Sequence, residues 1–384
     1  MTRHWYVPGG ALVPSRLQPA PTAFRVEPDR GGPYAVGVAK EVPGPWIRRP
    51  ASIVSVTLAT LLTPLVTPIA LLIAAAGDAI KRTRGMRRTR TVALITSLVL
   101  VDFAGFLLVS FTWLISPLGW GVDRPVSQAR YSRIMNWWTG SLIRKFSRFV
   151  PLPIDRSELD PEVLKGNAIV IGRHRSLIDA LMPAIVFGGE NLRVLYVLKD
   201  DLQWETNIDI VGHRMGHVFV DRNPKNLDRE LEPIRELATK IDNESVGVIF
   251  PEGTFFNEKR KARAVASLQR RNAAHAAAAE SMRCLLPPRP AGTLALLEGA
   301  PDADVVLLGH VGFEPFGSIR QILGNIGGEH GIRLKAWRFA RETVPVDPAE
   351  QVDWLFERWT EMDSWIAEQH ELAERSTTFS RPDQ

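Results

Sequence analysis

One short stretch, from Ile171 to Asp179, combines residue types that could do chemistry: His174 stands five positions before the carboxylate of Asp179. A β-branched run over 168–171 precedes the histidine and an apolar helical pattern over 180–186 follows, which puts the pair at a strand-to-helix junction. A carboxylate on one ring nitrogen of a histidine fixes the tautomer and raises the basicity of the other nitrogen. The pair is therefore a base with its orienter, and the hydroxyl that it activates would belong to a substrate.

Taken alone, the His-x4-Asp spacing also fits a capped helix with a chance histidine nearby. Ser176 lies between the two residues and has two interpretations. Its hydroxyl could cap the helix by accepting backbone N–H groups, or it could be a nucleophile that His174 activates. The cap is the favoured interpretation, and it leaves the substrate to supply the nucleophile.

Two further polar blocks follow apolar runs that predict strands. One is Pro251-Glu-Gly-Thr254, and the other ends in Arg222. With the proline-arginine-glycine turn around Arg289, the blocks resemble in order and spacing the glycerolipid acyltransferases, specifically the 1-acylglycerol-3-phosphate acyltransferases. The resemblance covers about residues 126–316.

The resemblance implies that His174 is a general base, that Asp179 orients it, and that acyl-CoA or acyl carrier protein donates the acyl group. The expected acceptor is the lysophospholipid lysophosphatidic acid, and no cofactor or metal is expected. The expected substrate-binding residues are Arg222, Glu252, Gly253, Thr254 and Arg289. Arg222 suits the acceptor phosphate because a guanidinium binds phosphate oxygens in pairs.

Two roles in this region stay open at the level of the sequence. Glu252 and Thr254 would either hold the glycerol portion of the acceptor or order the loop. Backbone N–H groups near Gly253 and in the first turn after His174 are the expected donors to the oxyanion of the tetrahedral intermediate.

Phe255 departs from the family pattern, in which an arginine follows the Glu-Gly-Thr block. A cationic phosphate ligand is therefore missing where one is expected. Arg173, or Lys259 and Arg260, could compensate for it. The departure bears more on the identity of the acceptor than on acyl transfer itself.

Composition narrows the possible partners and chemistry. The chain has 384 residues, a net charge of +5 and a single cysteine, Cys284, so it has no intrachain disulfide and no cysteine metal site. Its basic balance favours anionic partners. A nucleic-acid partner is not expected, because the basic residues flank apolar runs typical of membrane segments. His213 and His217 are four apart, but no third metal ligand accompanies them.

Two apolar runs predict membrane-embedded helices near the N-terminus. Each is long enough to cross about 30 Å of hydrocarbon. Six basic residues over 81–90 separate the runs, and the positive-inside rule places this loop in the cytoplasm. Two full spans would put the catalytic motifs outside the cell, away from a cytosolic donor. Pro64, Pro68, Asp102 and Gly105 interrupt the runs, so we expect that at least one does not span or that both dip into one leaflet.

The remaining pattern predicts an α/β fold: a mixed sheet flanked by helices. Strands are expected over 168–171, 194–198, 217–220, 246–250 and 305–310, and helices over 223–242, 258–282 and 349–375. The expected division is a disordered basic lead-in (1–50), two apolar membrane segments (51–120), an amphipathic interfacial helix (121–150), the acyltransferase domain (151–375) and a disordered tail (376–384). In the interfacial helix, Ile134, Trp138, Leu142, Phe146 and Phe149 form an apolar stripe that would face either the membrane or the core.

The sequence thus predicts a membrane-bound acyltransferase at the plasma membrane of a bacterium, with its catalytic domain facing the cytoplasm. Another acceptor, either glycerol 3-phosphate or a different lysolipid, is one alternative. A non-catalytic membrane protein that binds anionic lipid is the other, and the presence of both His174 and Asp179 argues against it.

Overall fold

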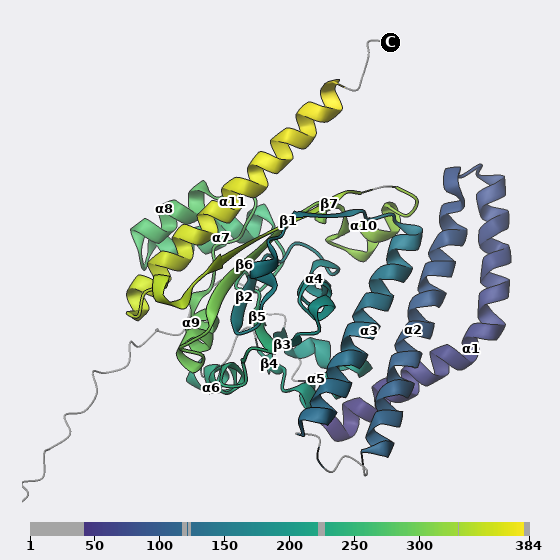
Figure 1. The fold of residues 1–384 in the computed structure, drawn as a ribbon. Coiled ribbons are helices and arrows are strands. Elements are labelled where there is room, and N and C mark those ends of the chain that lie inside the picture. The colour runs from purple at the N-terminus through teal and green to yellow at the C-terminus, as the bar shows by residue number, and fades with distance from the viewer. Residues whose placement is uncertain (1–41, 117–120, 122–123, 222–226, 329, 380–384) are drawn as a thin grey trace, which may run out of the picture.

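The computed structural model describes residues 42–116, 121, 124–221, 227–328 and 330–379 (Figure 1). The described part of the chain forms a seven-stranded sheet in the order β1-β7-β6-β2-β5-β3-β4. Its strands are β1 (Ile154–Glu158), β2 (Ala168–Gly172), β3 (Arg193–Lys199), β4 (Val218–Val220), β5 (Ser245–Ile249), β6 (Asp304–Val311) and β7 (Ile332–Phe339). Strands β2 to β6 run parallel, and β7 pairs antiparallel with β6. The predicted mixed α/β sheet is confirmed.

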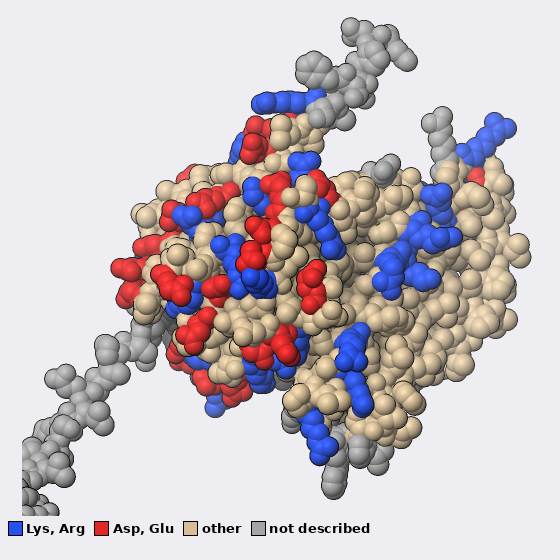
Figure 2. All heavy atoms as spheres, in the orientation of Figure 1, with Lys and Arg blue, Asp and Glu red and all other residues tan. Residues whose placement is uncertain are grey.

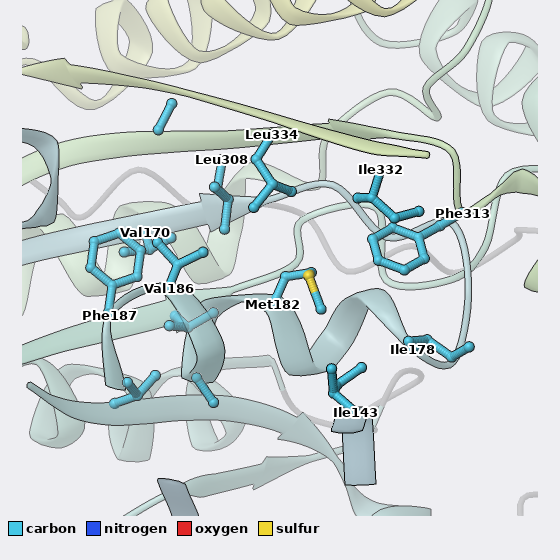
Figure 3. Packing of buried hydrophobic residues seen from close by; sticks show 14 of the residues in the cluster. Ile143, Val170, Ile178, Met182, Val186, Phe187, Leu308, Phe313, Ile332 and Leu334 are labelled. Atoms are coloured by element: carbon cyan, nitrogen blue, oxygen red, sulfur yellow. The ribbon is translucent and has the colours of Figure 1, made fainter. Parts of the chain in front are cut away.

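Strand β2 lies at the centre of the sheet and is buried on both faces. Side chains of a strand alternate between faces, and Val170 of β2 packs in one core whereas Ile169 and Ile171 pack in the other. Figure 3 shows the first core, where Met182 of α4 (Met182–Val186) lies between the sheet and neighbouring elements. Because both faces carry apolar side chains, helices must cover the sheet on both sides.

The helices divide between the two faces of the sheet (Figure 1). On one side lie α1 (Pro45–Ile80), α2 (Arg87–Ile115), α3 (Pro125–Phe149), α4 and α5 (Thr206–Met215); α10 (Ile319–Gly324) follows β6. On the other lie α6 (Leu227–Ala238), α7 (Glu258–Gln269), α8 (Ala273–Ser281), α9 (Pro290–Gly299) and α11 (Pro348–Phe379). The second core joins the sheet to α6, α9 and α11.

Helices α1 and α2 are both long and apolar enough to cross a membrane, as the sequence predicts. They pack against each other, with a hydrogen bond of 3.1 Å between the hydroxyls of Thr67 and Thr96. Asp78, the charge in the first apolar run, accepts from the backbone N–H and the hydroxyl of Thr89 and so caps the N-terminus of α2. Most leucine and isoleucine side chains of α1 remain exposed on the protein.

Both ends of this helical pair contact the α/β domain. Arg48 in the first turn of α1 is buried and pairs with Asp209 of α5 at 2.8 Å. Arg87 at the start of α2 donates to the carbonyl of Leu323 at 3.0 Å, and the backbone carbonyl of Asp102 in its middle accepts from the side-chain amide of Asn207 of α5 at 3.0 Å. Helix α1 begins at Pro45, so the prediction that residues up to 50 are disordered is wrong for 45–50. Residues 1–41 lie outside the described residues.

The apolar stripe of α3 packs on the core: Trp138 and Phe146 are buried. The exposed side of this helix instead carries a basic row of Arg130, Arg133, Arg144, Lys145 and Arg148, with Trp137 exposed among them. The interfacial role of the segment stays a prediction, and it now depends on the basic row.

Three predicted helices have different bounds in the structure. The helix predicted over 223–242 corresponds to α6, which ends at Ala238. The pattern over 258–282 is divided into α7 and α8, because Asn272 accepts from backbone N–H groups and starts a new helix. Helix α11 continues to Phe379, so 376–379 are helical, whereas 380–384 lie outside the described residues. Strands β1 and β7 were not predicted.

Candidate active site

The candidate site lies where β2, β5 and β6 end side by side. These three parallel strands are neighbours, and the loop after each leaves the same edge of the sheet. His174 follows β2, Glu252 follows β5, and His310 is the penultimate residue of β6. The topology thus brings together two of the predicted blocks, those of His174 and Glu252. Ligands of open α/β sheets bind at this carboxyl edge.

His174 and Asp179 form the predicted pair. The imidazole Nδ1 lies 3.0 Å from Oδ1 of Asp179, which leaves Nε2 as the ring nitrogen for a substrate. Asp179 is completely buried, and its Oδ2 accepts the backbone N–H groups of Arg175 (2.5 Å) and Ser176 (2.6 Å). The chain after β2 therefore folds around the carboxylate, which fixes the ring of the base.

His310 is a member of the site that the sequence analysis missed. Its Nε2 lies 3.4 Å from Oδ2 of Asp179, on the opposite oxygen from His174. Burial on its own would raise the pKa of Asp179, but hydrogen bonds from His174 and His310 hold it below its usual range. In the sequence, the signal for His310 is a histidine at the end of an apolar strand. Only the pairing of β2 with β6 shows that this histidine reaches the site.

Ser176 has the role expected of a capping residue. Its hydroxyl accepts from the backbone N–H groups of Ile178 and Asp179, both at 3.2 Å, and the side chain is buried. The hydroxyl thus stabilises the turn that leads into the helix.

Glu252 orders the loops of the site. One carboxylate oxygen accepts the backbone N–H of His174 at 2.7 Å, and the other accepts that of Leu286 at 3.0 Å. The residue is 2% exposed, and burial raises the pKa of its carboxyl to about 7, although both backbone bonds lower it. Of the two roles left open for Glu252, the structure favours the ordering of the loop.

The predicted oxyanion donors are already engaged within the protein. The backbone N–H groups of His174, Arg175 and Ser176 donate to carboxylates, and that of Gly253 donates to the carbonyl of Phe250 at 3.1 Å. These four groups are therefore not free to bind the oxyanion in this conformation, and the oxyanion donors of this region stay a prediction. The sequence could not show this engagement, because the acceptors lie on other elements.

The turn after β5 gathers aromatic and basic side chains beside the base. Gly253 has a φ of +63°, which a glycine adopts without strain, and Thr254 beside it is partly buried. The Phe255 ring packs edge-on against His174, with centroids 4.5 Å apart. Arg260 donates to the carbonyl of Phe255 at 2.9 Å.

Two more arginines border the same turn. The guanidinium of Arg175 donates to the carbonyl of Phe256 at 3.0 Å. The side chain of Arg289 lies beside Gly253, and a Cβ placed there would be 3.6 Å from it. Arg222 lies outside the described residues, and its assignment stays a prediction. Arg175 was missed because its position alone did not show which way it points.

Arg173 does not compensate for the missing cation. Its side chain is 2% exposed and donates to Glu314 at 2.9 Å and to the carbonyl of His310. Both partners lie on the β6 side of the site, away from the turn of Phe255. The prediction that Arg173 replaces the missing cation is therefore wrong. Of the other predicted pair, Lys259 and Arg260, Arg260 contacts the turn.

Comparison with known proteins agrees with this geometry. Residues 131–288 match the model of the family described as Acyltransferase. The matched segment, less than half of the chain, is thus similar to the acyltransferase family. The match includes the His174–Asp179 pair and Glu252, and the predicted resemblance to glycerolipid acyltransferases is confirmed.

Two similar proteins carry related names. The chain is 30% identical over 95 residues to 1-acyl-sn-glycerol-3-phosphate acyltransferase epsilon from Mus musculus; these residues are 24% of this chain and 26% of that protein. The chain thus matches about a quarter of the length of this relative. The crystal structure of the 1-acyl-sn-glycerophosphate (LPA) acyltransferase PlsC from Thermotoga maritima has 14% sequence identity and a TM-score of 0.46, covering 77% of this chain and all of that one.

Proposed function

We propose that this acyltransferase moves a fatty acyl group from a thioester donor, acyl-CoA or acyl carrier protein, to the free hydroxyl of lysophosphatidic acid, which gives phosphatidic acid. The observation that carries the proposal is the 3.0 Å contact between His174 Nδ1 and Asp179, at the carboxyl edge of a sheet that adjoins two apolar helices. The name of the similar mouse protein supports this acceptor.

The proposed reaction needs no acyl group on the serine of the motif. Nε2 of His174 takes the proton of the acceptor hydroxyl as its oxygen attacks the thioester carbonyl. Asp179 stabilises the imidazolium that forms. The tetrahedral intermediate then collapses, the carbon–sulfur bond breaks, and the leaving thiolate takes the proton from His174.

The acceptor phosphate would bind near the turn after β5, where Arg175, Arg260 and Arg289 gather. Guanidinium groups bind phosphate oxygens in pairs. Arg222, the residue that the resemblance assigns to this role, belongs to the same proposal. The Phe255 ring on His174 would then adjoin the glycerol portion or the acyl chain, which is where an apolar side chain is tolerated.

The membrane surface of the enzyme combines two features. In Figure 2 the surface over α1 and α2 is nearly free of charge, whereas basic side chains lie along its border with the catalytic domain, over α3. Exposed apolar side chains would enter the hydrocarbon, and the basic row of α3 would meet anionic headgroups. A lysolipid acceptor could then reach the site from the bilayer.

The contacts of α2 favour insertion into one leaflet. Arg87 and Asp102 both contact the catalytic domain, and they are 15 positions apart, or about 22 Å along a helix. A spanning α2 would therefore carry the domain into the hydrocarbon. We propose that the helical pair dips into the cytoplasmic leaflet of a bacterial plasma membrane, with the domain in the cytoplasm. Cysteines introduced near Lys240 and Asn257 on a Cys284→Ser background should resist external labelling in intact cells, and efficient labelling would refute this orientation.

A defined assay tests the reaction. Membranes that hold the enzyme are incubated with labelled acyl-CoA and a panel of lysolipids, monoacylglycerol and glycerol 3-phosphate. His174→Ala should lower turnover of lysophosphatidic acid about a hundredfold or more, the effect of losing a general base. His275→Ala is the matched control, because His275 also pairs with an aspartate, Asp353 at 2.6 Å, but between α8 and α11. Equal activity of both variants would refute the proposed base.

A second acceptor class follows from Phe255. If Phe255 adapts the site to a less charged acceptor, Phe255→Arg should abolish activity towards it; if the phosphate site is only weakened, the variant should use lysophosphatidic acid better. The measurement is kcat/KM for lysophosphatidic acid and for monoacylglycerol. Arg222→Ala should raise KM for the phosphorylated acceptor by about one to two decades, the value of a charge-assisted hydrogen bond of about 1.5–3 kcal/mol. An unchanged preference for phosphate would refute the lysophosphatidic acid assignment.

A further inference from the structure

A second group of reactive side chains lies beside the active site. Sγ of Cys284 is 3.8 Å from Nδ1 of His370, and Nε2 of the same ring is 3.2 Å from Glu314 Oε1. A thiol, an imidazole and a carboxylate in this order are the parts of a nucleophilic centre: the nucleophile, its base and the group that orients the base. Cys284 is the only cysteine of the chain.

Helix α11 builds this group from one of its faces. Asp363 accepts the backbone N–H groups of Arg283, Cys284 and Leu285 at 2.7–2.8 Å and so fixes the segment that carries the thiol. His370 stands seven positions later on α11, two turns along the same face. The thiol and the imidazole are therefore positioned by separate contacts on one rigid helix.

The charges of the group favour a reactive thiol. Hydrogen bonds to Cys284 and to Glu314 raise the pKa of His370 to about 9, so the ring is an imidazolium at neutral pH. Burial raises the pKa of Glu314, but His370 and Arg173 hold it below its usual range. A cationic imidazole beside the sulfur can give its proton to the thiolate that leaves the donor. The imidazole ring is 37% exposed and Cys284 is partly exposed, so a reagent can reach the group.

The group is joined to the active site through two contacts. Glu314 binds Arg173, the residue before the catalytic histidine, at 2.9 Å. On the other side, Leu286, two residues after Cys284, donates to Glu252 at 3.0 Å. The thiol therefore lies at the same edge of the sheet that would receive the acyl thioester.

We propose that Cys284, with His370 and Glu314, is a second acyl-accepting site, which takes the acyl group from the thioester donor as a covalent thioester. The sulfur of Cys284 attacks the carbonyl carbon, a new carbon–sulfur bond forms, and the bond to the donor sulfur breaks. The His370 imidazolium gives a proton to the departing donor thiolate and is reprotonated by the proton that leaves the Cys284 thiol, so the products are S-acyl Cys284 and the free donor thiol. The choice of donor rests on the function proposed above, whereas the nucleophilic group does not.

Intact-protein mass spectrometry of the full-length enzyme in detergent, with palmitoyl-CoA as the probe, tests the proposal. The wild type should gain one acyl mass that neutral hydroxylamine removes, because it cleaves thioesters readily and oxygen esters slowly. Cys284→Ser should abolish the adduct. His370→Gln, which keeps a polar side chain at the position, should slow its formation at least tenfold, and His174→Ala should leave it.

The outcomes separate this inference from the proposed function. Acylation of an added lysophosphatidic acid without a hydroxylamine-labile adduct would overturn the inference and leave the proposed function standing. An adduct on Cys284 that forms equally fast in His370→Gln would also overturn it, because the thiol would then react without help from the group. A labile adduct that depends on His370, with no turnover of any acceptor, would support the inference and refute the proposed function.

Discussion

Replacement of Glu252 by glutamine separates a loop-ordering role from a substrate-binding role. The carboxylate holds the backbone N–H groups of His174 and Leu286, one on each oxygen. An amide has only one oxygen, so in Glu252→Gln one of the two N–H groups faces an NH₂ group and loses its partner. The variant keeps the size of the side chain, so the change is confined to hydrogen bonding.

The size of the effect follows from the lost bond. A hydrogen bond to a charged group contributes about 1.5–3 kcal/mol, and a domain of this size loses about 2–4 °C in Tm per kcal/mol. We therefore expect Glu252→Gln to lower Tm by roughly 3–12 °C. Because the backbone of the base moves, kcat should fall while KM for the acceptor changes little.

Thermal unfolding followed by tryptophan fluorescence in detergent gives Tm, and the labelled acyl-CoA assay gives kcat and KM. Glu258→Gln is the matched control, because Glu258 is exposed in the first turn of α7. It should change neither quantity. An unchanged Tm together with a raised KM in Glu252→Gln would show that this carboxylate binds the acceptor, and our assignment would be wrong.

Three further predictions concern other charged groups. Asp179→Asn should lower kcat about a hundredfold or more without loss of membrane binding, because an amide does not hold the imidazolium; near-normal kcat would contradict the mechanism. The pKa of His370 is raised to about 9, so the contribution of this imidazolium to stability is complete below about pH 6.5 and is lost as pH rises through 9. The difference in Tm between wild type and His370→Gln should therefore shrink from pH 6.5 to 9.5. A difference that stays constant would refute this prediction. Asp209→Ala leaves the buried Arg48 guanidinium without its carboxylate, and breaking a buried ion pair in this way costs about 3–5 kcal/mol. Proteolysis within the first turns of α1 should therefore accelerate. The double variant Arg48→Met with Asp209→Leu should restore protection from proteolysis.

The sequence was informative where a pattern is local. The apolar run 168–171 and the following polar turn predicted β2 and the contact between His174 and Asp179, because both features lie within a dozen residues. Strand β1 was missed because Ile154–Glu158 is mostly polar. Strand β7 was missed although its alternate residues Ile332, Leu334 and Ala336 are buried, a period that the sequence carries.

The site itself was predictable only in part. The roles of Glu252 and His310 depend on the register between β2, β5 and β6, which brings residues about 80 and 130 positions apart along the chain into contact with the first motif. The engagement of the four N–H groups was not predictable, and the buried Arg173 was misjudged, for the same reason. Sequence spacing states which residues are available, whereas long-range pairing decides which of their groups are already occupied.

The two edges of the sheet have a consequence for the proposed membrane enzyme, whose copies would be concentrated on a two-dimensional surface. Strand β4 at one edge has three residues, and β1 at the other carries charged side chains and a register irregularity between Asp155 and Glu158. Short, charged or irregular edge strands are poor templates for pairing with another chain. Neighbouring copies on a crowded bilayer would therefore find little backbone to pair with, which opposes aggregation through the sheet even at high local density.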